Sequence, residues 1–95
     1  MPARVANEDA LIKRWIEVNP NKPGPADAWV LPGCVAVWVL IRQLDLEGGA
    51  VETVANDYEL PLEAVGAAIA YHKKHRKVID QRIARNRAFF AALHE

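Results

Sequence analysis

The amino-acid sequence predicts a small, mainly α-helical domain organised around a helix-turn-helix. Its 95 residues suit one domain, and 52% of them are hydrophobic, which is enough for a core and an interface. Residues 51–69 carry apolar side chains at helical spacing on both sides of a tight turn. The flanking segments show more helical than alternating periodicity, so we expect four or five helices and little sheet.

The N-terminal part predicts a helix over residues 8–18 and then a linker. Asn7 suits the N-cap of this helix, and one helical face is apolar. That face consists of Leu11, Ile12, Trp15 and Ile16. Residues 19–27 contain three prolines and a glycine, which argues against helix and predicts a linker that hinges the first helix away from the core.

Residues 28–44 combine a short β segment with a helix. Residues 28–31 fit a short strand and Pro32-Gly33 fits a turn. Residues 35–44 fit either strand or helix at their start and helix at their end, because a short apolar run does not separate the two. The tryptophans are assigned by their surroundings, Trp38 to the core and Trp15 and Trp29 to an interface.

The first helix of the helix-turn-helix has Val51, Val54 and Tyr58 on one face. Leu60 then fills the turn. Pro61 can open the second helix because its missing N–H would have no partner there. This spacing predicts two helices that cross closely.

The second helix continues to about residue 75 and would turn Leu62, Val65 and Ile69 toward the core. The outward residues are then Pro61, Glu63, Gly66, Ala67 and Ala70. None of them is a good reader of base edges, a task that falls mainly to Arg, Lys, Asn and Gln. Two uses therefore stay open for the helix-turn-helix, DNA reading and a purely architectural role.

The C-terminal quarter predicts a basic helix over residues 77–93. Residues 1–70 hold 5 Lys+Arg and 10 Asp+Glu, whereas residues 71–95 hold 7 and 2. Asp80 suits the positive end of this helix. The apolar stripe of the helix consists of Ile79, Ile83, Phe90 and Leu93.

Two groups of residues in this basic region are candidate binding sites. Contacts with DNA phosphates are assigned to Lys73, Lys74, Arg76 and Lys77. Partner contacts are assigned to Arg82, Arg85, Arg87, Phe89, Phe90 and Leu93. The first group also fits a solvated helix end or an acidic protein partner, and the second also fits packing on its own domain or on a second copy.

The sequence gives little support to catalysis, to a metal or to a cofactor. Cys34 is the single cysteine, so it cannot form an intramolecular disulfide, and no activating partner is evident for it. His72 and His75 alone make an incomplete metal site, and His75 can instead pair with Asp80 or cap neighbouring carbonyls. No apolar run is long enough to span a bilayer. We therefore expect a cytoplasmic protein that is not an enzyme and has no membrane role.

Several strings in the sequence resemble the bacterial family called domain of unknown function 433. They are NPNKPGPADAWV, AVWVL, VANDYELPLEAVGAAIAYHKKHRKVIDQRI and ARN. The most specific are PGPADA, VANDYELP and AIAYHKKHRKVID. The chain departs from the family's pattern at Ala36, where relatives commonly carry Pro, and at Cys34, near a common Gly-Thr-Arg turn.

The resemblance implies a trihelical or winged-helix-like domain, often dimeric, that is encoded beside a PIN-like nuclease. It further implies an antitoxin that neutralises its partner toxin. Our first hypothesis is that this antitoxin also binds double-stranded DNA as an autorepressor of transcription. In that reading the C-terminal helix occupies a groove of the nuclease and directs an Arg into its acidic metal site. The alternative is a homodimeric protein-interaction module that does not bind DNA.

Overall fold

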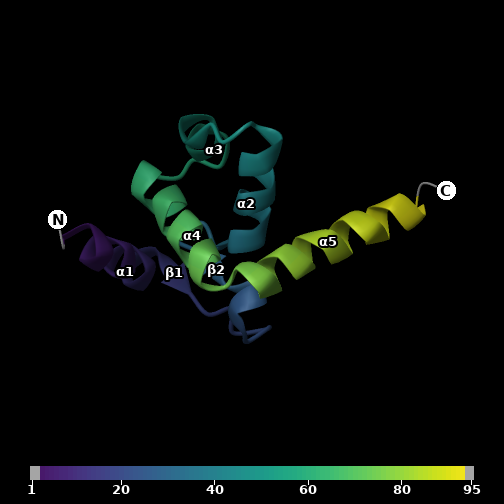
Figure 1. The fold of residues 1–95 in the computed structure, drawn as a ribbon, viewed down its shortest axis with the longest axis horizontal. Helices are drawn as coiled ribbons and strands as arrows, with labels where there is room; N and C mark the ends of the chain where they lie inside the picture. The colour runs from purple at the N-terminus through teal and green to yellow at the C-terminus, as the bar shows by residue number, and fades with distance from the viewer. Residues whose placement is uncertain (1–2, 94–95) are drawn as a thin grey trace.

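The structure is a computed structural model that describes residues 3–93, with side chains described from Glu8 onward. The described residues form five α-helices and a small sheet (Figure 1). The helices are α1 (Ala3–Trp15), α2 (Val37–Leu46), α3 (Val51–Asp57), α4 (Leu62–Lys74) and α5 (Arg76–Leu93). The strands are β1 (Ile16–Glu17), β2 (Trp29–Val30) and β3 (Val35–Ala36), with the 3-10 helix η1 at Pro25–Asp27. The predicted mainly helical class is confirmed.

The sheet is antiparallel in the order β1-β2-β3. Ile16 pairs with Val30, and Val30 pairs in turn with Val35. The strand expected at residues 28–31 is therefore present, as Trp29–Val30. The two outer strands have two residues each, too few for the alternation that would have marked them in the sequence.

The core lies where α2, α3, α4 and the first turns of α5 meet the sheet. Its largest fully buried side chains are Leu40, Ile79, Val30, Val37, Val54 and Val65. Trp38 is buried, as predicted. Trp15 is half-buried and packs against this core, and its assignment to an interface stays a prediction.

The helix-turn-helix has the predicted turn. Leu60 is buried at 7% exposure, and its N–H donates to the Ala55 carbonyl at 2.8 Å. Leu62, however, is 52% exposed, so its place in the core stripe was wrong. It opens α4 on the solvent side, because Ala64, Val65 and Ala68 are the α4 residues that face the core.

The N-terminal segment differs most from its prediction. Asn7 lies inside α1 rather than at its cap, and Ile16 leaves the helix for β1. Residues 19–27 form a turn and then η1, so the expectation of no helix there was wrong. They also do not hinge α1 away, because β1 pairs with β2 and the Leu31 N–H donates to the Trp15 carbonyl at 2.7 Å. These bonds hold α1 against α4.

Candidate protein-interaction site

The face of α4 that was expected to point outward is covered by α1. Ala67 and Ala70 are 0% and 3% exposed, so their predicted exposure was wrong. A Cβ built on Gly66 would lie 3.9 Å from Leu11 Cδ1, which shows how closely α1 approaches. Small side chains permit this approach, as they do wherever helices pack tightly. Glu63 is exposed as predicted.

The candidate phosphate-binding residues lie where α4 ends and α5 begins. Lys73 Nζ lies 2.9 Å from Glu8 Oε2 of α1, and Lys74 forms an ion pair with Asp9. Arg76 and Lys77 are exposed in the first turn of α5. A nucleic acid that approached this corner would have to compete with the two carboxylates of α1.

The bend between α4 and α5 is fixed by side chains on both helices. His72 Nε2 lies 2.7 Å from Asp80 Oδ1, and the rings of Tyr71 and His75 lie 4.4 Å apart. Of the two alternatives for His75, the pairing with Asp80 was wrong, because the chain turns at His75 and brings the preceding turn of α4 to face α5. His75 is the C-cap residue of α4, and its backbone N–H donates to the carbonyls of Tyr71 and His72 at 3.1 and 3.2 Å. Burial raises the pKa of Tyr71 above its ordinary value.

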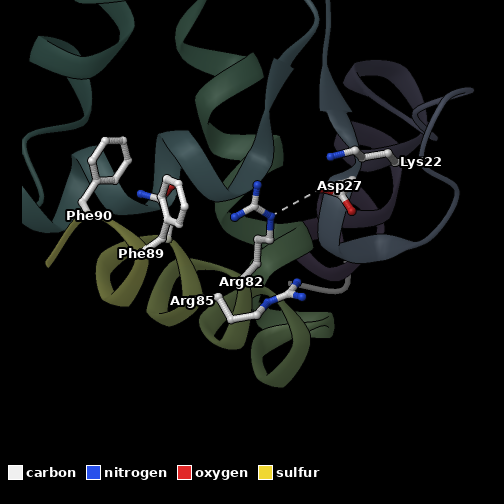
Figure 2. Close-up of a pocket in the computed structure, with 7 residues that line it drawn as sticks. Lys22, Asp27, Arg82, Arg85, Phe89 and Phe90 are labelled. Carbon is white, nitrogen blue, oxygen red and sulfur yellow. Dashed lines mark ion pairs between the residues drawn. The ribbon is translucent and has the colours of Figure 1, made fainter. Parts of the chain in front are cut away.

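The base of α5 is attached to the body through Arg82. Its guanidinium carbon lies 4.3 Å from the centre of the Trp38 ring, and its Nε lies 3.6 Å from Asp27 Oδ1 (Figure 2). Arg42 approaches the same ring at 5.4 Å. Arg82, which was expected to contact a partner, is therefore part of the domain's own packing. The contact of arginine side chains with the Trp38 ring was not predicted. Arg42 follows Trp38 by four residues, a spacing that places both side chains on one face of a helix and could have indicated the contact.

The second half of α5 leaves the body (Figure 1) and stays exposed. Phe89, Phe90 and Leu93 are 60%, 50% and 61% exposed. Phe90 and Leu93 extend the predicted apolar stripe of α5, and they lie past the body because the helix leaves it beyond Ile83. The partner contacts assigned to them stay a prediction. The exposed guanidinium groups of Arg85 and Arg87 accompany these apolar side chains.

An open hollow of about 620 Å³ follows this part of α5 (Figure 2). It is lined by Lys22, Asp27, Arg82, Arg85, Asn86, Phe89 and Phe90. The two phenylalanine rings meet edge to face with centres 5.7 Å apart. The last turns of α5 thus carry both cationic and aromatic side chains. We call them the α5 surface and define it as Arg85, Arg87, Phe89, Phe90 and Leu93; Arg87 lines a second hollow, together with Asp45 and Asp80.

Two further properties concern the part of the chain that the structure describes. It contains no group of three His, Cys, Asp or Glu side chains placed to hold a metal ion. None of its helices is long and apolar enough to cross a membrane.

Comparison with known proteins adds no relative. No protein-family model, no curated protein and no solved structure matches this chain. The resemblance to domain of unknown function 433 therefore stays a prediction, as do the functions it implies.

Proposed function

We propose that this chain is a protein-binding module that presents the α5 surface to a partner, as an antitoxin does to its toxin. The observation that carries the proposal is the exposure of Phe89, Phe90 and Leu93, each at 50–61%, on a helix that leaves the body. Isolated exposed apolar residues are ordinary, but a contiguous group with Arg at its edge is typical of an interaction site.

The spacing on α5 suits a helix that binds in a groove. Arg85, Phe89 and Leu93 follow one another at intervals of four residues and so form one stripe, with Phe90 beside it. A large apolar side chain gains about 1.5–3 kcal/mol on full burial, and here roughly half of that gain is still available at each position. Burial of these three side chains in a groove would therefore stabilise a complex more than burial of a single exposed residue would.

The charge of the α5 surface indicates the chemistry of the partner. Arg85 and Arg87 have no carboxylate between them and the end of the described helix. Arg forms bidentate hydrogen bonds with carboxylates, so the groove that receives α5 should be acidic as well as apolar. The metal site of a PIN-like nuclease has this character, and an Arg placed there would neutralise the catalytic carboxylates.

DNA binding by α4 is not part of the proposal. Ala67 and Ala70 are buried under α1, and Lys73 and Lys74 have carboxylate neighbours. These contacts favour the architectural use of the helix-turn-helix, in which it positions α5.

The experiment is a calorimetric titration of this chain with a PIN-like nuclease, the class of toxin that the proposal requires, together with an assay of the nuclease's activity. Phe89→Ser/Leu93→Ser should weaken binding at least tenfold and relieve inhibition of the nuclease. Val18→Ser is the matched control, because Val18 is 58% exposed and belongs to neither α4 nor α5. Wild-type affinity and inhibition by the double variant would overturn the proposal.

A further inference from the structure

The second hollow, of about 290 Å³, lies where α2, α4 and α5 meet. Arg42 and Asp45 line it from α2 and Arg87 lines it from α5, while Ile41 and Ile83 belong to the apolar part of its wall. Its volume lies at the small end of the range for ligand pockets, about 300–1,000 Å³. An apolar wall with a few polar groups is typical of a site for a small molecule.

Three charged side chains of this hollow make no ion pair. Among the side chains that the structure describes, none forms an ion pair with Arg42, Asp45 or Arg87. Arg42 approaches the Trp38 ring, but its Nε is buried and makes no hydrogen bond within the described part of the chain. Buried polar atoms of this kind are rare in native proteins, because their desolvation costs free energy that no hydrogen bond offsets. A ligand that accepts a hydrogen bond from Arg42 would therefore bind favourably.

The carboxylate that remains for a ligand is that of Asp45. Asp80 also lines the hollow, but its Oδ1 lies 2.7 Å from Nε2 of His72 and so is already engaged. The hollow then offers two guanidinium groups and one free carboxylate. These charges suit a ligand that carries both a carboxylate and an ammonium group. They do not suit a doubly charged anion such as phosphate, which both aspartates would repel.

The spacing of these residues along their helices places opposite charges close together. Arg42 and Asp45 are three residues apart on α2, so their side chains are neighbours on one face of the helix. An α-amino acid likewise carries its carboxylate and its ammonium group on one carbon atom. Apolar side chains lie next to the charges, because Ile41 precedes Asp45 by four residues and Ile83 precedes Arg87 by four residues. The ligand should therefore have an apolar side chain as well.

We propose that this hollow binds a free α-amino acid with an apolar side chain. The carboxylate of the ligand accepts hydrogen bonds from Arg42 and Arg87, and its ammonium group donates to Asp45. Its side chain packs against Ile41 and Ile83. The inference goes beyond the proposed function, because the ligand is a small molecule and the hollow shares only Arg87 with the α5 surface.

The test is a calorimetric titration of the purified chain with L-leucine and with two analogues that each lack one charge. Isocaproate lacks the ammonium group, and in leucinamide a neutral amide replaces the carboxylate. Leucine should bind with a dissociation constant below about 1 mM, and each analogue should bind at least tenfold more weakly. The titration contains no nuclease, so its outcome does not depend on the proposed function.

Two variants locate the binding, Arg87→Gln and Asp45→Asn. Both residues are exposed, so the substitutions should leave the fold intact, which thermal unfolding would check. Each variant should bind leucine at least tenfold more weakly than the wild type. Asp45→Asn should not weaken the binding of isocaproate, because isocaproate has no ammonium group for Asp45 to accept a hydrogen bond from.

The matched controls are Arg85→Gln and Asp57→Asn, which change exposed residues of the same types outside this hollow. Both should bind leucine like the wild type. The proposal would be overturned by a wild-type chain that shows no binding of leucine up to about 10 mM. Analogues that bind as tightly as leucine, or hollow variants that bind leucine as tightly as their controls, would also overturn it.

Discussion

Gly66 gives a direct test of how closely α1 and α4 pack. A glycine inside a helix costs about 1 kcal/mol relative to alanine. A methyl group at this position would meet only Leu11 Cδ1, at 3.9 Å, which is an ordinary van der Waals contact. Gly66→Ala should therefore raise the free energy of unfolding by about 1 kcal/mol, or the melting temperature by about 4–8 °C for a domain of this size.

The assay is thermal and urea unfolding followed by circular dichroism, with Ala67→Lys as the companion variant. Ala67 is 0% exposed, so a lysine there has to bury a charge or push the covering helix away, at a cost of several kcal/mol. An alanine at position 66 that destabilises the protein would mean that α1 lies closer than the structure has it. A lysine at position 67 without effect would mean that this face of α4 is open, and the reasoning against DNA reading by α4 would fail.

Three further predictions concern the α4–α5 region. In gel shifts, the chain should bind its own upstream DNA no better than random DNA, and binding to both DNAs should be lost near physiological salt. The variant Lys73→Glu/Lys74→Glu should bind both DNAs more weakly than the wild type. A retained preference of the wild type for its own upstream DNA would contradict this prediction. The free energy of unfolding should fall as the pH rises above 10.0, the ordinary pKa of tyrosine, and it should fall less in the variant Tyr71→Phe than in the wild type. Burial raises the pKa of the folded phenol, so the unfolded chain loses its proton first and stability declines through this range; equal slopes for both proteins would refute the burial. Arg82→Ala should lower the free energy of unfolding in urea by about 1 kcal/mol, because the contact of Arg82 with Trp38 is lost. The stability of Arg82→Lys should lie between those of the wild type and Arg82→Ala. An unchanged urea midpoint of Arg82→Ala would show that the contact contributes nothing.

Local patterns in the sequence predicted much of the fold. The turn at Leu60, the burial of Val54 and Val65, and the strand at Trp29–Val30 all follow from periodicity and turn chemistry, and the structure has each of them. These features depend on residues that are close together in the chain. A short window of sequence is therefore sufficient to predict them.

The errors concern contacts between distant segments. Ala67 and Ala70 were taken as exposed because no pattern within α4 indicates that α1 returns to cover them. The return depends on the pairing of β1 with β2, and β1, with two residues, is too short to be recognised in the sequence. The position of Phe90 and Leu93 beyond the body was not evident either, since their spacing continues the stripe of Ile79 and Ile83 and does not show where the body ends.

The candidate sites were only partly recoverable for the same reason. The basic and apolar character of α5 was evident from its composition. The same composition led us to assign Phe89 and Arg85 to an exposed surface that contacts a partner. The attachment of Arg82 to Trp38 and Asp27 depends on three separated segments, and no single segment indicates it.

The central claim is that the α5 surface, and not α4, meets the partner. The most direct measurement is amide hydrogen exchange of the chain, held dilute enough to be monomeric, with and without a PIN-like nuclease, the class of partner named in the proposed function. We expect slowed exchange over residues 85–93 and unchanged exchange over α1 and α4. Slowed exchange confined to α1 or α4, with residues 85–93 unaffected, would contradict it.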